Sequence, residues 1–159
     1  MGVSASQHRL LMAVATLGPV GHLKRAPGTW ASAITLPLAF ALLWAGGPIA
    51  LAIAALCVIA FGIHAGGHAV RELKREDPSE IVVDEVAGMM LALLPALPGG
   101  LISMVAAFLL FRFFDIVKPW PISLIDRRVT GGIGVMADDV AAGILAAASL
   151  MLLRLAGAV

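Results

Sequence analysis

The chain is organised as long apolar stretches separated by short polar breaks. Predominantly apolar sequence runs from Trp30 to Ala45, from Pro48 to Gly66 and from Val140 to Val159. A fourth region, Val86 to Phe114, is equally apolar but is broken by prolines and glycines between Pro95 and Gly100. Because a membrane-spanning α-helix needs about 20 residues of this kind, these stretches predict helices embedded in a lipid bilayer.

The broken region predicts two shorter helices, at about Ser79–Leu94 and Leu101–Phe114, joined by a tight turn. Asp77 or Ser79 is suited to cap the first of these helices, with Pro78 at its first helical position. Glu80 and Asp84 would then share one helical face, four residues apart. Near the N-terminus, the short apolar run from Leu10 to Leu17 predicts a further helix that faces the membrane.

Together these elements predict an all-α fold, a polytopic membrane bundle of about four or five membrane-embedded helices with acidic loops on one face. The length allows a single domain, residues 1–159. Composition strengthens the prediction, because 60% of the residues are hydrophobic and only 13% are charged. A soluble domain usually has about 45–50% apolar and about 25% charged residues.

Charge is confined to one side of the predicted bundle. All ten acidic residues lie between Glu72 and Asp139, in two segments that the helix trace places on the face carrying Gly28. Ten of the eleven basic residues fall on that face too, and only Arg154 lies opposite. An excess of Lys and Arg marks the cytoplasmic side of a membrane protein, so we expect the acidic face to be cytoplasmic. No basic tract with interleaved aromatic residues is present, so we expect no nucleic-acid partner.

Two acidic pairs exceed what helix capping requires. Asp84 and Glu85 come directly before an apolar run, and Asp138 and Asp139 directly before the last apolar helix. A solvated N-terminal turn favoured by the helix dipole explains Asp77 and Glu80. It explains Asp84 and Glu85 less well, because paired carboxylates at the mouth of a membrane helix are costly unless they are used. Sites rich in carboxylate oxygens suit magnesium or manganese.

A third charged group follows the predicted Leu101–Phe114 helix. Arg112, Asp115 and Lys118 are spaced by three residues, so the end of a helix would align them. One interpretation is an ion-pair ladder at the membrane interface. The other gives Lys118 an anionic phosphate and Asp115 a metal ion, and the spacing does not decide between them. His64 and His68 also share a helical face, but without a third ligand nearby they predict packing or polar contacts rather than zinc.

The sequence resembles the phosphatidylglycerophosphatase A family over nearly its whole length. The resemblance rests on three blocks: Ala26-Pro27-Gly28-Thr29, then Val83-Asp84-Glu85-Val86-Ala87-Gly88-Met89, and then Phe114-Asp115 through Lys118-Pro119-Trp120-Pro121-Ile122 to Gly131–Gly143. It implies a magnesium-dependent enzyme of the bacterial inner membrane. The implied reaction removes the terminal phosphate of phosphatidylglycerophosphate, which yields phosphatidylglycerol and inorganic phosphate in phospholipid biosynthesis.

On this basis each candidate residue has a hypothetical role. The expected magnesium ligands are Asp84, Glu85, Asp138 and Asp139, with Asp115 as a further ligand or a base. Lys118 and Arg112 would stabilise charge on the phosphoryl group, and Thr29 and Ser32 would hydrogen-bond the phosphate or headgroup. The residues assigned to catalysis are therefore Asp84, Glu85, Asp115, Lys118 and Asp139.

Two alternatives from other functional classes remain. One is a small membrane transporter with an acidic ion-binding cluster, although its acids would be expected near the middle of the bilayer. The other is a non-catalytic membrane scaffold, for which the paired acids would be needless. The sequence also leaves assembly into a homo-oligomer open.

Overall fold

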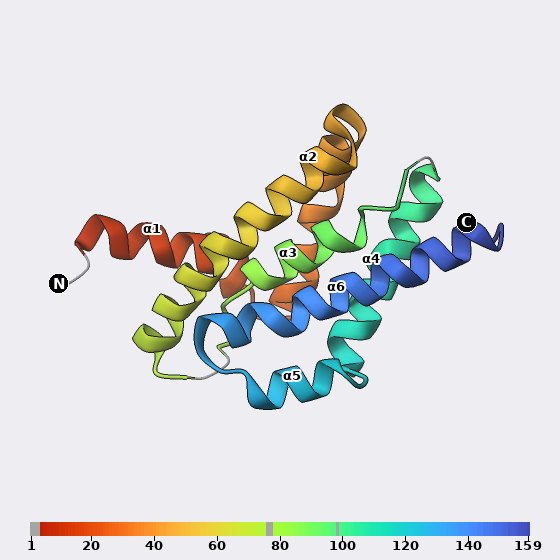
Figure 1. The fold of residues 1–159 in the computed structure, drawn as a ribbon. Helices are drawn as coiled ribbons and strands as arrows, with labels where there is room; N and C mark the ends of the chain where they lie inside the picture. The colour runs from red at the N-terminus through yellow and green to blue at the C-terminus, as the bar shows by residue number, and fades with distance from the viewer. Residues whose placement is uncertain (1–3, 76–77, 98) are drawn as a thin grey trace.

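The fold consists of helices throughout the residues described by the computed structural model, which are 4–75, 78–97 and 99–159. In chain order they are α1 (Ala5–Ala15), the short 3-10 helix η1 (Val20–His22), α2 (Pro27–Leu73), α3 (Val83–Ala92), α4 (Gly100–Val117), α5 (Ile122–Arg128) and α6 (Gly131–Leu155). Figure 1 shows α3 enclosed between α2, α4 and α6. The predicted all-α class is confirmed.

Helix α2 is two helical arms joined at a sharp break. Gly47 has φ 72° and ψ −178°, a conformation outside the helical region that residues with a side chain rarely adopt. Pro48 follows and begins the second arm, since proline is well tolerated in the first turn of a helix. The arms fold back on each other at this point (Figure 1), so the break predicted between the first two apolar stretches is confirmed.

Within the described residues, three helices are long and apolar enough to cross a membrane: α2, α4 and α6. Because α2 contains two arms, four apolar helical segments surround the core. Helix α3 has ten residues and extends about 15 Å at 1.5 Å per residue, which is too short to span a bilayer. The predicted number of four or five membrane-embedded helices agrees with four long segments and one short helix packed among them.

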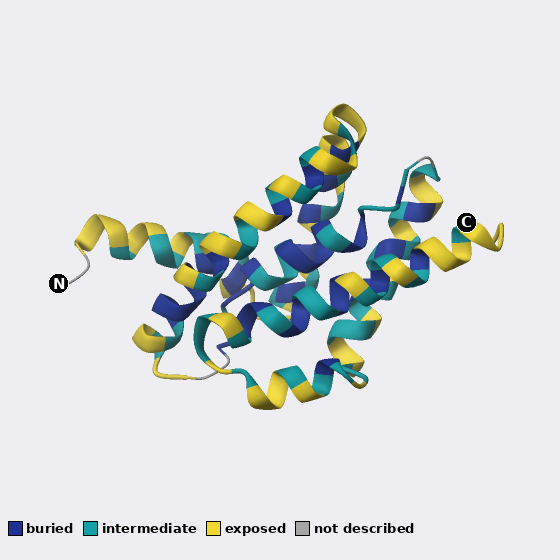
Figure 2. Cartoon of the chain, in the orientation of Figure 1, coloured by how far each residue is buried: buried dark blue, intermediate teal, exposed yellow. Residues whose placement is uncertain are grey.

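The outer surface of the bundle is apolar and its interior is packed with small residues. Trp44, Leu101 and Leu155 are among the large hydrophobic side chains that are more than 70% exposed, and Figure 2 shows exposed positions along the outer sides of the long helices. Buried positions include many alanines, such as Ala55, Ala107 and Ala146. Apolar outer surfaces and small residues at helix contacts are typical of proteins that are solvated by lipid.

A close crossing of α3 and α6 positions the acidic residues. A Cβ added at Gly143 would lie 2.5 Å from the backbone oxygen of Gly88, and one added at Gly88 would lie 2.7 Å from the backbone oxygen of Asp139. Only glycine permits the two backbones to approach this closely. The crossing therefore brings the first turn of α3, with its two acids, beside Asp139 of α6.

The start of α3 differs from the sequence prediction. The helix begins at Val83, with Val82 as its N-cap and no capping side chain, rather than at about Ser79. Val82 instead donates a backbone hydrogen bond of 2.9 Å to Ala15, the last residue of α1. This tertiary contact holds the preceding segment out of the helix.

As a result, Glu80 lies outside the helix that carries Asp84, so the predicted shared helical face is wrong. Glu80 instead forms an ion pair of 2.5 Å with Arg75. The predicted cap Asp77 lies outside the described residues, as does Pro98 of the predicted turn.

Candidate active site

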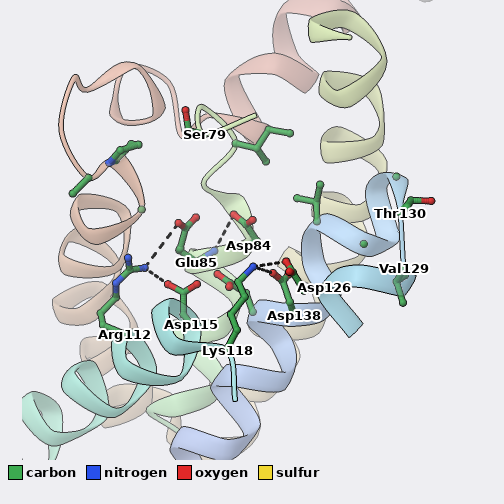
Figure 3. Close-up of a pocket in the computed structure, with 18 residues that line it drawn as sticks. Ser79, Asp84, Glu85, Arg112, Asp115, Lys118, Asp126, Val129, Thr130 and Asp138 are labelled. Atoms are coloured by element: carbon green, nitrogen blue, oxygen red, sulfur yellow. Dashed lines mark hydrogen bonds and ion pairs between the residues drawn. The ribbon is translucent and has the colours of Figure 1, made fainter. Parts of the chain in front are cut away.

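A pocket of about 470 Å³ opens at one end of the bundle, which we call the pocket end. The start of α3, the last turn of α4 and the first half of α6 line it, together with the start of α2 (Figure 3). Its charged lining consists of six carboxylates and two cations: Asp84, Glu85, Asp115, Asp126, Asp138, Asp139, Arg112 and Lys118. The two acidic segments that were predicted to share one face of the bundle meet at this pocket.

Three of these carboxylates form a tight group that we call the acidic triad: Asp84, Glu85 and Asp139. One carboxylate oxygen from each lies within 4.8 Å of those of the others. Asp139 is buried, and its Oδ2 has no hydrogen-bond partner among the described residues; the same holds for Oε2 of Glu85. Buried polar atoms are normally paired, so these orphaned oxygens fit a bound cation. An all-oxygen donor set of this charge suits a hard divalent metal ion.

The raised pKa values of the two acids at the start of α3 also fit a site that is completed by a cation. Burial raises the pKa of Asp84 well above its ordinary value, and the charges of Glu85 and Asp139 raise it further. Burial likewise raises the pKa of Glu85, although Arg112 favours its charged form. Both carboxyl groups therefore hold protons more readily than usual while no cation compensates their charge.

Arg112 occupies the α4 wall of the pocket. It forms an ion pair with Asp115, one helical turn further along α4, and its guanidinium lies 3.9 Å from Glu85. These side chains are only 13–16% exposed. The predicted alignment of Arg112 and Asp115 is thus realised as an ion pair, which lies beside Glu85 of the acidic triad.

Lys118 ends α4 and lies between two carboxylates. Its Nζ is 2.5 Å from Asp126 and 2.6 Å from Asp138 (Figure 3). Partial burial lowers the pKa of Lys118, but the two carboxylates outweigh it, and the net pKa is above the ordinary value. The ammonium group is therefore charged, and it is held at the pocket by the two acids.

The structure separates Asp138 from the three other predicted metal ligands. Asp138 binds Lys118, whereas the neighbouring Asp139 joins the acidic triad. Adjacent residues point about 100° apart around a helix, so a single rotation of α6 directs one acid to the lysine and the other to the triad.

Thr29 and Ser32, predicted to contact the phosphate or headgroup, are not among the residues that line the pocket. Ser32 is fully buried and donates its hydroxyl hydrogen to the backbone oxygen of Gly28 at 2.9 Å. Ala26, Pro27 and Gly28 of the same block do line the pocket. Gly28 lies against the Glu85 carboxylate, with which an added Cβ would collide.

The sequence reasoning also missed Asp126 as a partner of Lys118. The two residues are eight positions apart with a proline turn between them, so no local spacing rule connects them.

The charge balance limits what the pocket can bind. With all groups ionised, six carboxylates and two cations give a formal charge of −4. A phosphate monoester would be repelled until divalent cations offset this charge. With such a cation at the acidic triad, the two basic side chains could contact phosphate oxygens from the other walls.

Fold and site together define a helical membrane protein with an acidic pocket suited to a metal ion and an anion. A family model described as Phosphatidylglycerophosphatase A matches residues 13–154. The phosphatidylglycerophosphatase A of Haemophilus influenzae is 40% identical over 129 residues, 79% of this chain and 77% of its own length. That of Escherichia coli is 34% identical over 125 residues, 78% of this chain and 72% of its own.

The chain belongs to the phosphatidylglycerophosphatase A family. Family membership confirms the prediction that the protein is an enzyme, specifically a phosphatase. No solved structure matches this fold.

Proposed function

We propose that the protein hydrolyses phosphatidylglycerophosphate to phosphatidylglycerol and inorganic phosphate in a magnesium-dependent reaction of phospholipid biosynthesis. The substrate follows from the names of the two relatives. The observation that carries the proposal is the arrangement of the pocket. An acidic triad with orphaned oxygens faces Lys118 and Arg112 at one end of an apolar bundle.

In this proposal Asp84, Glu85 and Asp139 hold the magnesium ion. The bound ion would neutralise phosphate oxygens and lower the pKa of a water molecule. Lys118 would contact the phosphate oxygens as a point charge, since its own two carboxylate partners already hold it at the pocket wall. Arg112 offers a planar fork that fits phosphate geometry, and Asp115 fixes its orientation.

The proposed reaction transfers the phosphoryl group to water. The water oxygen attacks phosphorus while the bond from phosphorus to the glycerol oxygen breaks. Asp115 is the proposed base: Arg112 binds its carboxylate, whose remaining lone pairs can accept the proton from water. Asp115 would then pass this proton to the departing glycerol oxygen, which restores its carboxylate and balances charge and atoms. The acyl chains remain in the bilayer beside the apolar outer surface, and only the headgroup enters the pocket.

We also propose that the pocket faces the cytoplasm from a bacterial inner membrane. Basic residues stand at element ends around the pocket: Lys24 precedes α2, Arg71 and Lys74 end it, and Arg127 lies in the last turn of α5. Arg154 alone lies at the other end of α6. This asymmetry matches the usual excess of Lys and Arg on the cytoplasmic side.

Phosphate release from the purified full-length protein tests the proposal. In detergent–lipid micelles containing phosphatidylglycerophosphate, we expect release with magnesium, loss of release with a chelator, and recovery when magnesium is restored. Phosphatidic acid serves as a substrate control, because it is also a lipid phosphomonoester but lacks the second glycerol. Absence of release, together with cation flux through protein-containing liposomes, would instead establish the transporter alternative.

A further inference from the structure

A second group of potential metal ligands lies where α1 packs against the second arm of α2. His8 Nδ1 of α1 is 2.9 Å from His68 Nε2 of α2. Glu72 follows His68 by one helical turn, and one ligand atom from each of the three residues lies within 4.8 Å of the others. We call this group the histidine cluster. It shares no residue with the pocket.

The surrounding structure holds the cluster in place. The N-terminus of α1 is fixed by a capping box in which Ser4 and Gln7 bind each other's backbone N–H groups, and His8 follows in the first turn. His68 is only 5% exposed. The two imidazole rings meet edge to face, with centroids 5.1 Å apart. The exposed Glu72 leaves one side of the cluster open to solvent.

From this geometry we propose that the histidine cluster is a second metal site, which binds a borderline transition-metal ion such as Zn²⁺ and clamps α1 to α2. Two imidazole nitrogens and one carboxylate oxygen are a donor set typical of zinc with an open fourth position. Around a tetrahedral zinc ion, two nitrogens are about 3.3 Å apart, so the 2.9 Å spacing needs only a small adjustment. Magnesium prefers oxygen ligands, so the cluster and the acidic triad select different ions.

A metal ion bound at the histidine cluster would also stabilise the position of α3 at the pocket. Ala15, the last residue of α1, accepts the backbone hydrogen bond of Val82 at 2.9 Å. Val82 is the N-cap of α3, whose first turn carries Asp84 and Glu85. A metal ion that joins α1 to α2 therefore stabilises the helix end that holds the start of α3. The opposing interpretation is a simple hydrogen bond between the two imidazole rings, with Glu72 in solvent.

Metal-binding measurements distinguish the proposed metal site from a simple hydrogen bond. They use the full-length protein in detergent, without a histidine tag. Excess magnesium is present throughout to occupy the acidic triad. Cobalt(II) is titrated as a visible probe of a nitrogen-containing site, and zinc is then added to displace it. The variants are His8→Ala and His68→Ala, with His64→Ala as the matched control. His64 is exposed on the same arm of α2, one turn before His68, and is not part of the cluster.

We expect one cobalt ion per chain with a tetrahedral spectrum in the wild type and His64→Ala. Affinity should fall more than about tenfold in His8→Ala and His68→Ala. Zinc should raise the thermal unfolding temperature of the wild type and His64→Ala but not of His8→Ala. His8 is only partly buried, so circular dichroism should show unchanged helix content in that variant and keep the test valid. Equal binding by His8→Ala and His64→Ala, or no binding by the wild type, would overturn the proposal. Neither result bears on phosphate release at the acidic triad.

Discussion

The two ends of α6 differ in whether their polar side chains have hydrogen-bond partners. At the pocket end, Asp139 is buried beside two other acids, and one of its oxygens has no partner among the described residues. At the other end, Arg154 donates hydrogen bonds to the backbone oxygens of Pro95 and Leu97 in the turn between α3 and α4.

One helix therefore carries an unsatisfied carboxylate at one end and a satisfied guanidinium at the other. A buried polar group that lacks partners is costly, so its presence at Asp139 indicates function. Arg154 closes an irregular turn whose carbonyl groups would otherwise face lipid or apolar side chains, where unpaired backbone groups are expensive. The comparison predicts that changes at the pocket end affect turnover without loss of stability, and that changes at Arg154 do the reverse.

Asp139→Asn should have the largest effect. The substitution keeps the shape of the side chain but removes one charge from the acidic triad. We expect phosphate release to fall by about a thousandfold, equivalent to roughly 4 kcal/mol of transition-state stabilisation. In the absence of magnesium the free energy of unfolding should stay equal or increase, because one of three neighbouring like charges is removed.

The matched control is Asp126→Asn, the same chemical change at a carboxylate that is 39% exposed and outside the triad. Its turnover should fall far less. Phosphate-release rates and thermal unfolding of both variants test whether turnover depends on the charge within the acidic triad. A wild-type rate for Asp139→Asn would exclude the triad as the catalytic centre.

Lys118→Met should have the next largest effect. It removes the only lysine in the pocket lining but keeps most of the side-chain volume. Loss of one preorganised cationic contact should lower kcat/KM by about a hundredfold, and Lys118→Arg should recover part of it. If Lys118 belonged only to an interfacial ion-pair ladder, both variants would retain wild-type kcat/KM and lose only stability.

The sequence could predict most of the residues that form this site but not which of them contact each other. The apolar pattern located the long helices and the break between Ala45 and Pro48, and the excess of acids over capping needs pointed to Asp84, Glu85, Asp138 and Asp139 alike. The roles of Asp138 and Asp139 depend on the rotation of α6, which the contact between Gly88 and Gly143 fixes. That contact joins residues far apart in the chain, so no local spacing shows it.

The start of α3 was mispredicted for a related reason. Capping rules favour a helix that begins near Ser79, but the backbone hydrogen bond from Val82 to Ala15 holds the segment in a non-helical form. Local capping preferences are worth about 1 kcal/mol, so a tertiary contact with buried Ile81 and Val82 overrides them.

Acidic pH should produce a smaller effect that magnesium reverses. The pKa values of Asp84 and Glu85 are raised in the metal-free protein, so these groups take up protons at a higher pH than ordinary carboxyl groups. Metal binding requires their deprotonated forms. As the pH falls through the raised values, protons displace the metal and activity declines.

Raising the magnesium concentration tenfold should therefore move the acidic limb of the pH–rate profile to lower pH. Rates measured across pH at two magnesium concentrations test this. An acidic limb that does not move with magnesium would show that proton uptake occurs outside the acidic triad.

Arg154→Met should have the smallest effect on turnover and a clear effect on stability. The substitution leaves the carbonyl groups of Pro95 and Leu97 without their charged donor, and we expect the free energy of unfolding to fall by about 1–3 kcal/mol. Nη1 of Arg154 donates to both carbonyls. Arg154→Lys keeps a charged donor on a shorter side chain, so its free energy of unfolding should lie between those of Arg154→Met and the wild type. Equilibrium unfolding in mixed micelles measures the loss of stability, and phosphate-release rates at low temperature measure turnover separately. A loss of kcat in Arg154→Met at a temperature where the variant is fully folded would show that the two ends of α6 are coupled, and that the division between a functional and a structural end is wrong.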